Sequence, residues 1–336
     1  MLVFSVESSC DETAVCIMSK ERKIFSHIIY SQEIHQKHGG VVPELASRAH
    51  LEILQVITKK AFEESGLKLS NIDLFSATCG PGLIGGLLIG STFVKSLSIG
   101  LKKPFIPINH LEAHVLSPFY NNPINFPHLS LLLTGGHTQI YLLNNFKQIN
   151  LLGETVDDAI GEAFDKVAKI LGLNYPGGKE LEIRAKKGNE NKFILPKPLI
   201  NHNNLNFSFS GLKTAVNLIS KENNIDEKFV NDMSASFQKC VSEILESKLE
   251  KAIIKLNSSN IFLSEISLVG GVANNNYLKT KLTEVSKKYK VKLVLPITEM
   301  ISDNAAMIAW LSLNKYNINS NDLNFKPDPR LSIKND

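Results

Sequence analysis

The sequence predicts an α/β protein built from two lobes, and three observations support this fold class. The chain has 336 residues, 43% of them apolar, which is ample for a buried core but long for one compact unit. Segments with the alternation of strands and segments with the periodicity of helices follow one another along most of the chain. A short pattern of strand, polar turn and strand also occurs twice, once in each half of the chain.

The first third of the chain predicts strands and helices in the order β-β-β-α-β-α-β. The strands are short, rich in Val, Ile, Phe and Tyr, and separated by turn-sized gaps. The first helix starts at Pro43 and is closed by Gly66. The second helix is apolar but interrupted by glycines and Lys95, which favours a buried helix over a membrane span. These elements are expected at residues 2–8, 13–19, 23–30, 43–64, 72–78, 83–101 and 104–108.

The rest of the chain predicts a second set of elements and a last helix with Ser302 at its N-cap position. Strands are expected at 129–133, 139–143, 266–269 and 291–295, and helices at 156–171, 212–220, 227–256, after residue 271, and at 303–316. We expect residues 1–109 to form the N-terminal lobe, with helix 303–316 packing back on it. Residues 110–302 are expected to form the C-terminal lobe, and residues 317–336 a tail.

The two halves resemble each other around the polar turns. When Thr13 is placed opposite Thr138, each half shows a strand, a polar tip and a second strand. Two such hairpins, facing each other across a cleft, form the phosphate clamp of actin-, hexokinase- and Hsp70-like ATPases. The repeat therefore favours that fold, and a Rossmann-like doubly wound sheet stays open as the alternative.

Composition and charge set further limits. The 37 Lys and Arg residues against 33 Asp and Glu give a net charge of +4, which permits a nucleic-acid partner without requiring one. None of the four cysteines forms a C-x-x-C pair, which indicates reduced thiols in a cytosol. The N-terminus enters a strand-like run without a signal-peptide pattern, so we expect a cytoplasmic protein with no membrane attachment.

His110 and His114 form the sharpest local signal for chemistry. Residues four apart share one face of a helix, so both imidazoles can reach one metal ion. Glu112 lies two positions after the first histidine and turns away from that face, which argues against a peptidase of the H-E-x-x-H type. Two surface or capping histidines would give the same spacing, and a metal ion would still need an oxygen ligand.

Two turns and one helix start have the composition of phosphate-binding segments. Gly135 and Gly136 allow backbone N–H groups to approach a phosphate, and Asp11 and Glu12 at the other tip could orient a nucleotide or a water molecule. The segment 270–275 combines glycines with a helix N-terminus, which suits an anion. Each segment could equally be an ordinary turn or helix cap. A kinase, a nucleotide-dependent transferase and a regulatory ATPase all remain open from these features.

Longer strings of the sequence resemble the bacterial TsaD family, which was once labelled a glycoprotease family. They occur in order from residue 7 to about residue 310, so the resemblance covers essentially the whole chain. The strings are ESSCDET at 7–13, GGVVPELASR at 39–48, HLEAH at 110–114, GGHT at 135–138, GEAFDK at 161–166, YPGG at 175–178, FSFSGLKT at 207–214 and SDN at 302–304.

The resemblance implies the two-lobed actin/hexokinase/Hsp70-type ATPase fold and a specific reaction. The family carries out the last step in forming N6-threonylcarbamoyladenosine at adenosine 37 of tRNAs that read codons beginning with A. The donor would be threonylcarbamoyl-AMP, and AMP would leave. The implied partners are tRNA, a paralogous pseudo-enzyme subunit that is TsaB-like, and a small P-loop ATPase that is TsaE-like.

The resemblance also assigns residues by their positions. His110, His114 and Asp303 would hold one divalent metal ion, with Fe²⁺ favoured over Zn²⁺. The residues that would hold the threonylcarbamoyl-adenylate are Leu133, Thr134, Gly135, Gly136, His137, Asp165, Gly178, Glu182 and Asn275. Asp11 or Glu12 is our candidate for orienting or deprotonating the adenosine amine. One position departs from the family pattern, because Asn276 stands where many members have Arg.

Three other functions compete with the transferase. A metallopeptidase would cleave peptides in a chelator-sensitive manner, and the position of Glu112 argues against it. A small-molecule kinase of the same fold would need a catalytic Asp followed by glycine, which the segment Asp11-Glu12-Thr13 does not offer. A non-enzymatic ATPase scaffold would fail to transfer threonylcarbamoyl from purified adenylate.

Overall fold

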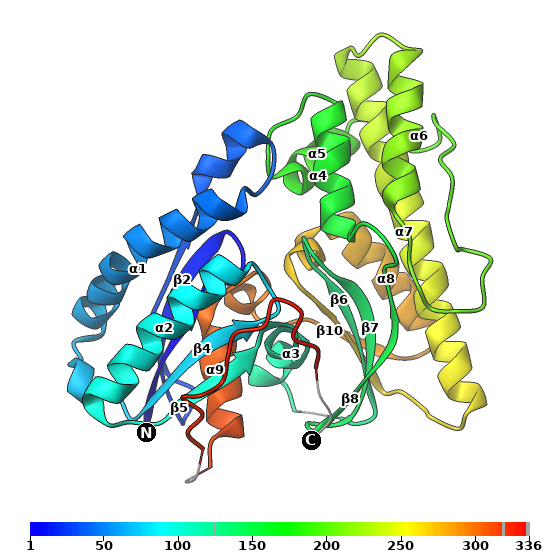
Figure 1. Ribbon diagram of the computed structural model, residues 1–336. Helices are drawn as coiled ribbons and strands as arrows, with labels where there is room; N and C mark the ends of the chain where they lie inside the picture. The colour runs from blue at the N-terminus through cyan, green and yellow to red at the C-terminus, as the bar shows by residue number, and fades with distance from the viewer. Residues whose placement is uncertain (124, 318–319, 334–336) are drawn as a thin grey trace. The chain divides into compact units, whose positions relative to one another are not determined.

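The computed structural model describes residues 1–123, 125–317 and 320–333, and its chain divides into two compact units (Figure 1). Unit 1 consists of the described residues of Met1–Asn122 and Pro296–Lys334, and unit 2 of those of Pro123–Leu295. The first boundary lies after residue 122, whereas the sequence predicts it after residue 109. The reason is the short helix α3 (His110–Leu116), which packs on α9 (Ala305–Lys315) and on strands of unit 1.

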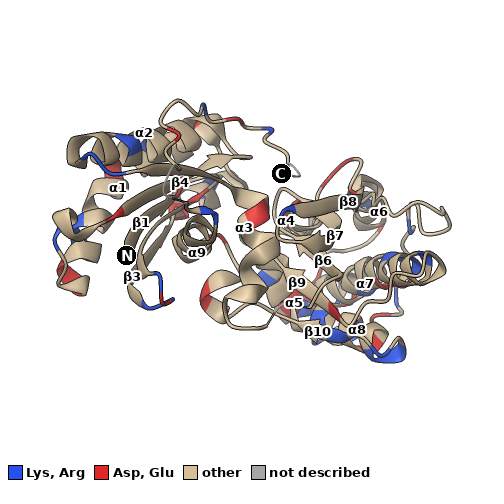
Figure 2. Cartoon of the chain, turned by 90° about the horizontal axis from the view of Figure 1, so that it is seen from below, with Lys and Arg blue, Asp and Glu red and all other residues tan. Residues whose placement is uncertain are grey.

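Unit 1 contains a five-stranded mixed sheet with the order β3-β2-β1-β4-β5. The first three strands form an antiparallel meander, and β4 and β5 run parallel to β1. Helices α1 and α2 cover one face of the sheet, and α9 packs against β1 and β2 on the other (Figure 2). The bounds are β1 Leu2–Glu7, β2 Glu12–Ser19, β3 Ile24–Ser31, β4 Leu74–Gly80, β5 Phe105–Asn109, α1 Pro43–Ser65 and α2 Ile84–Leu101.

The core of unit 1 follows the alternation of its strands. Phe4 of β1 and Phe75 of β4 point to the face that α1 and α2 cover, where they pack with Ile57 and Val94. The opposite side of the same strands carries small polar residues, and the hydroxyls of Ser5 and Ser76 are hydrogen-bonded to each other. The sheet thus separates an apolar layer from a layer that leads to α9 and α3.

Unit 2 repeats the sheet of unit 1, with the strand order β10-β9-β6-β7-β8. Here β6, β7 and β8 form the antiparallel meander, and β9 and β10 run parallel to β6. The hairpins end at equivalent places, at the pair Glu7–Ala14 in unit 1 and at the pair Leu133–Thr138 in unit 2. This confirms the duplicated hairpin but shifts its register by one residue, because Ala14 and not Thr13 lies at the place of Thr138. The two mixed sheets do not match the Rossmann-like alternative.

Helices between the strands complete unit 2. Three of them lie between β8 and α7, and α8 follows β9. The bounds are β6 His128–Leu133, β7 Thr138–Asn145, β8 Gln148–Glu154, β9 Glu265–Val269, β10 Lys292–Val294, α4 Ile160–Ile170, α5 Gly177–Ala185, α6 Ser210–Lys221, α7 Glu227–Ser258 and α8 Asn276–Lys288.

Most elements begin and end within a few residues of the predicted bounds, but two helix starts differ. Helix α4 begins at Ile160 and not at 156, because Asp157 accepts hydrogen bonds from the backbone N–H and hydroxyl groups just before α6. Helix α9 begins at Ala305, and its N-cap is Asn304, whose Oδ1 accepts a hydrogen bond from the Met307 N–H at 2.8 Å. The predicted N-cap, Ser302, is therefore wrong. The sequence also does not predict β8 or α5.

Helix α2 alone, within the part of the chain that the structure describes, is long and apolar enough to cross a membrane. Buried helices of globular units have the same composition, and α2 packs on β4 and α1. Its glycines allow this close approach. A Cβ atom on Gly86 would lie 2.2 Å from the carbonyl oxygen of Ser8, and one on Gly90 would lie 2.1 Å from the Ser8 hydroxyl.

The segment between α5 and α6 forms no helix or strand and lies along α7 in unit 2. Side chains of α7 hold this segment by hydrogen bonds. Asp232 accepts a hydrogen bond from the Asn189 N–H, and Lys248 donates further along the helix. The Lys248 side chain is fully buried, and its ammonium group donates to the carbonyl oxygens of Leu199 at 2.7 Å and Asn204 at 2.9 Å. Two backbone carbonyl groups of this segment therefore share one buried lysine as their donor.

Replacing Lys248 by Met is expected to lower the free energy of unfolding of unit 2 by about 1–3 kcal/mol, since it removes two hydrogen bonds that a charged donor makes to partly buried carbonyl groups. Urea denaturation measures this loss, and limited proteolysis should find new cleavage between residues 189 and 204. Lys239→Met is the matched control on the same helix. Its ammonium group bonds Asn191 near the surface, so this change should cost less than about 1 kcal/mol. Equal losses in the two variants would contradict the anchoring role of Lys248.

Candidate functional site

Helix α3 places two buried histidines side by side in unit 1. Asn109 ends β5 and caps the helix, because its Oδ1 accepts a hydrogen bond from the Glu112 N–H at 3.1 Å. His110 and His114 follow four residues apart, as the helical spacing predicts, and their rings meet edge to face with centroids 4.7 Å apart. The capped start of α3 thus places both imidazoles on one face of the helix.

Asp303 joins these two histidines from the turn before α9. Its Oδ1 lies 2.9 Å from His114 Nε2 and 3.5 Å from His110 Nε2. One ligand atom from each of the three residues lies within 4.8 Å of the others. The histidines are buried, whereas the Asp303 side chain is 20% exposed, so the cluster has a side that is open to solvent. The structure brings together the three residues that the sequence resemblance names as metal ligands.

Glu7, at the end of β1, supports His110 from behind. Its side chain is fully buried, and its Oε2 accepts a hydrogen bond from His110 Nδ1 at 3.1 Å. The same oxygen accepts a hydrogen bond from the Thr78 hydroxyl, and Oε1 accepts one from the Ser9 N–H at 2.6 Å. Glu7 is not among the site residues predicted from the sequence. A carboxylate at the end of a predicted buried strand is the signal that could have identified it.

Close charges in this cluster shift the pKa values of its members. Burial alone would lower the pKa of His110, but the carboxylates of Glu7 and Asp303 raise it well above its usual value. Burial would raise the pKa of Asp303, but His110 and then His114 outweigh it and hold that pKa far below its usual value. Burial lowers the pKa of His114. His114 is therefore a neutral imidazole and Asp303 an ionised carboxylate, which are the forms that bind metal ions, whereas the raised pKa of His110 favours an imidazolium that must release its Nε2 proton when a metal ion binds.

The donors fit a divalent transition metal and not a zincin-type site. Two imidazole nitrogens and one carboxylate oxygen suit Fe²⁺ or Zn²⁺ and leave further coordination positions for other ligands. Glu112 takes no part in the cluster, because its Oε2 accepts a hydrogen bond from Lys315 Nζ at 2.6 Å. In an H-E-x-x-H peptidase the glutamate would face the metal ion.

The first hairpin tip carries the two carboxylates that the sequence singled out. His50 of α1 holds this tip, because its ring nitrogens lie 2.8 Å from the Thr13 hydroxyl and 3.0 Å from the carbonyl oxygen of Cys10. Burial raises the pKa of Glu12 well above its usual value, and the negative charges of Asp11 and Asp303 add to this effect. A raised pKa makes a carboxylate a stronger proton acceptor than an ordinary one.

The second hairpin tip lies against the start of α4 in unit 2. The N–H groups of Gly161 and Glu162 donate to the carbonyl oxygens of Thr134 and Gly135, both at 3.2 Å. A Cβ atom on Gly161 would lie 2.7 Å from the Cα atom of Gly135, so only glycine permits this approach. Gly135 and Gly136 themselves are exposed, with open space where a side chain would be. Their backbone is thus accessible to a ligand.

The other candidate adenylate residues of unit 2 connect α4, α5 and α8. Asp165 of α4 accepts a hydrogen bond from the Gly177 N–H at 2.7 Å, at the start of α5, where Gly178 follows. Glu182 of α5 accepts hydrogen bonds from Asn276. Asn275 is buried and caps α8, with its Oδ1 accepting from the Leu278 N–H at 3.0 Å. These residues therefore order the starts of α5 and α8, which is a structural role beside any ligand contact.

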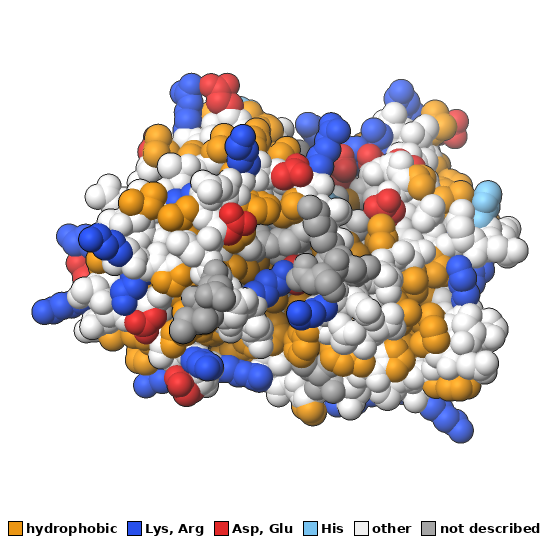
Figure 3. Space-filling model, turned by 60° about the horizontal axis from the view of Figure 1, so that its bottom comes forward, with side chains coloured by type: hydrophobic (Ala, Val, Ile, Leu, Met, Phe, Trp, Pro, Cys, Tyr) orange, Lys and Arg blue, Asp and Glu red, His pale blue; other side chains and the backbone are white. Residues whose placement is uncertain are grey.

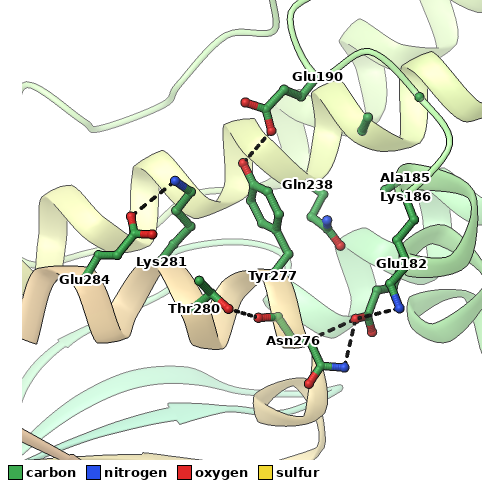
Figure 4. A pocket seen from close by; sticks show the side chains of 12 residues that line it. Glu182, Ala185, Lys186, Glu190, Gln238, Asn276, Tyr277, Thr280, Lys281 and Glu284 are labelled. Carbon is green, nitrogen blue, oxygen red and sulfur yellow. Dashed lines mark hydrogen bonds and ion pairs between the residues drawn. The ribbon is translucent and has the colours of Figure 1, made fainter.

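A pocket of about 350 Å³ opens between α5, α7 and α8 (Figure 4). Glu182, Gln238 and Tyr277 line it from these three helices. Gln238 was not predicted from the sequence. Its Oε1 accepts a hydrogen bond from Asn275 Nδ2 at 2.9 Å, which leaves its amide donors for the pocket. The Tyr277 hydroxyl donates to Glu190 at 2.9 Å. The pocket thus adjoins the candidate adenylate residues and offers an amide, a carboxylate and an aromatic ring.

Loss of any one of the three clustered side chains in unit 1 is expected to remove bound metal ion, because each supplies one ligand. Metal analysis of purified His110→Ala, His114→Ala and Asp303→Ala proteins tests this, with circular dichroism to follow the fold. His38→Ala is the control, because His38 is an exposed histidine outside the cluster and should keep full metal content. Wild-type metal content in His114→Ala would contradict the site.

Solved structures with related folds support the two-lobed ATPase-type architecture. HypF of T. kodakarensis aligns with a TM-score of 0.62 at 14% identity, covering 93% of this chain and 47% of HypF. Component A of the (R)-2-hydroxyglutaryl-CoA dehydratase of Acidaminococcus fermentans aligns with a TM-score of 0.52 at 14% identity, covering 94% of this chain and 98% of that one. At this level of identity the likeness concerns the fold, which is the actin/hexokinase-type fold that the sequence predicts.

Sequence relatives are much closer and extend over the full chain. The family model described as "TsaD: tRNA N6-adenosine threonylcarbamoyltransferase" matches residues 23–310. The tRNA N6-adenosine threonylcarbamoyltransferase of Rickettsia canadensis is 48% identical over 337 residues, covering 99% of this chain and 98% of that protein. The enzyme of the same name from Wolbachia pipientis wMel is 44% identical, with the same shares of both chains. The chain therefore belongs to the TsaD family of tRNA N6-adenosine threonylcarbamoyltransferases.

Proposed function

We propose that this chain transfers the threonylcarbamoyl group of threonylcarbamoyl-AMP to N6 of adenosine 37 in tRNAs that read codons beginning with A. The observation that carries the proposal is membership in the TsaD family over nearly the whole chain, which makes the protein a tRNA-modifying transferase. The relatives give no support to a metallopeptidase, a small-molecule kinase or a non-enzymatic scaffold. The donor, the metal ion and the residue roles are the finer parts of the proposal.

Unit 1 would hold one divalent metal ion through His110, His114 and Asp303, with Fe²⁺ favoured over Zn²⁺. When bound, the ion supplies a Lewis acid and a template for the donor. The support is the convergence of two imidazole nitrogens and one carboxylate oxygen within 4.8 Å. Glu112 is held by Lys315 and contributes no ligand there.

Unit 2 would bind the adenylate. Backbone N–H groups of the tip suit its phosphate, because Gly135 and Gly136 are exposed. The pocket beside Glu182 and Asn276 has the size and the polar groups to take the nucleoside part. The residues proposed for this ligand are Leu133, Thr134, Gly135, Gly136, His137, Asp165, Gly178, Glu182 and Asn275.

The proposed reaction requires the side chains mainly to position the reactants and to accept one proton. The mixed anhydride of the donor already activates the carbonyl carbon, so the protein must mainly position the two reactants. The adenosine N6 amine is a weak nucleophile, and it loses a proton as the new C–N bond forms and AMP leaves. Asp11 or Glu12 would orient this amine or accept its proton. The hydrogen bonds of His50 to Thr13 and Cys10 hold the hairpin tip that carries these two carboxylates.

Partner proteins would supply part of the tRNA affinity. The net charge of +4 over 336 residues provides little attraction for a polyanion. On the face shown in Figure 3, Lys and Arg side chains are mixed with Asp, Glu and apolar side chains. A TsaB-like subunit and a TsaE-like ATPase would complete the machinery. The tRNA substrate and the four free cysteines suit a cytoplasmic location.

Bulky side chains at the accessible glycines should block the donor without harming the fold. A Cβ atom at Gly136 or Gly178 meets no atom within 4 Å, so valine fits the protein itself and would occupy ligand space. Calorimetry of Gly136→Val and Gly178→Val with a non-hydrolysable adenylate analogue should show lost binding. Gly100→Val is the control, because Gly100 of α2 has equally open surroundings and lies in unit 1. Wild-type affinity in both unit 2 variants would place the donor elsewhere.

The reaction itself can be tested with purified adenylate, an adenosine-37 stem-loop and the partner proteins, with ATP omitted from the transfer step. Radiolabelled threonine should enter the RNA. Asp11→Asn should still bind the adenylate but transfer about 10²–10⁴-fold more slowly, because the amide cannot accept a proton. No incorporation by the wild-type protein with all components present would refute the function. Normal transfer by Asp11→Asn would refute only the role given to that carboxylate.

A further inference from the structure

Glu7 is a fully buried carboxylate that the proposed reaction leaves without a role. It ends β1 and faces away from solvent, with no exposed side-chain area. An ionised carboxylate in such a place is unfavourable unless several donors surround it. Three donors do so: the Ser9 N–H, the Thr78 hydroxyl and His110 Nδ1. They come from the hairpin tip, from β4 and from α3.

The two histidines of the cluster differ in what lies behind them. His110 Nδ1 is 3.1 Å from Glu7 Oε2, with the Ser9 hydroxyl 3.3 Å from the same nitrogen. His114 Nδ1 is buried and has no hydrogen-bond partner among the residues that the structure describes. Among the described residues, a carboxylate thus supports the Nδ1 atom of only one of the two imidazoles. That imidazole belongs to His110, the first residue of α3.

We propose that Glu7 is a positioning residue that fixes the ring of His110 and keeps its proton on Nδ1, so that Nε2 presents its lone pair to the metal ion. The inference rests on the proposed metal site of His110, His114 and Asp303. Carboxylates behind metal-bound histidines hold the ring orientation and make the imidazole a stronger ligand. In unit 1 this geometry is present, because Nδ1 faces Glu7 while Nε2 faces Asp303.

The chemistry of the site requires glutamate and excludes glutamine. Each donor around Glu7 points at an oxygen that must accept, and a carboxylate has two such oxygens. A glutamine has one accepting oxygen and one NH₂ group. If its NH₂ group faced His110, it would drive the proton of His110 to Nε2 and block the metal-binding nitrogen. If it faced Ser9, it would oppose the Ser9 N–H donor.

Calorimetric titration of chelator-treated full-length protein with Zn²⁺ tests the inference. Glu7→Gln, which keeps the side-chain volume, should bind Zn²⁺ about 10- to 100-fold more weakly than the wild type. Thr78→Val is the matched control. It removes a different donor to the same oxygen but keeps the carboxylate–imidazole pair, so its affinity should change far less. Wild-type Zn²⁺ affinity in a folded Glu7→Gln protein would overturn the inference and leave the metal site standing.

A second measurement needs no substitution at Glu7, in case that variant does not fold. Nitrogen-15 NMR of the zinc-loaded wild-type protein should show a slowly exchanging proton on His110 Nδ1, shifted by its bond to a carboxylate. The signal is assigned by its loss in His110→Ala. An His110 ring without a proton on Nδ1 would overturn the inference. Unchanged Zn²⁺ binding by His114→Ala would instead remove the metal site, and the role of Glu7 with it.

Discussion

The burial of one negative charge at the end of β1 organises the chemistry of unit 1. Glu7 has no exposed surface, so its carboxylate is stable only if the surrounding backbone and side chains donate to it. The donors come from the hairpin tip, from β4 and from α3, three segments far apart in the sequence. Satisfying this charge therefore fixes the tip that carries Asp11 and Glu12 and, at the same time, the ring of His110.

The duplicated sheet explains how one topology serves two different tasks. Both units place a hairpin tip beside two parallel strands, but the chain inserts different segments afterwards. In unit 1 the strand β5 leads directly into α3, so imidazoles follow a strand end. In unit 2 the helices α4 to α7 lie between β8 and β9, and the start of α4 is hydrogen-bonded to the second tip. The candidate metal ligands thus belong to unit 1, and the accessible glycine backbone and the pocket beside Glu182 belong to unit 2.

The sequence predicts the parts of this architecture that depend on local pattern. The apolar periodicity of α1, the pairing of β1 with β2 and the spacing of His110 and His114 are local, and all three agree with the structure. The bond of Glu7 to His110 spans 103 residues and the bond of Gln238 to Asn275 spans 37, so no local pattern reveals either bond, although a carboxylate at the end of a buried strand marks Glu7 as unusual. The helix α5 escapes prediction because it begins with two glycines, which are poor helix formers.

Asn276, which stands where the family pattern has Arg, brings no positive charge to the unit 2 site but still bonds Glu182. Where many family members have Arg, Asn276 donates to Glu182 through its backbone N–H at 3.1 Å and its side-chain amide at 3.3 Å. An amide satisfies the carboxylate without cancelling its charge, whereas a guanidinium would do both. Lys186 lies 3.8 Å from the same carboxylate, and with Lys281 it lines the neighbouring pocket. Positive charge at this site therefore comes from Lys186 at the C-terminal end of α5 and from Lys281 of α8, and the backbone N–H of residue 276 joins the two helices whatever side chain it carries.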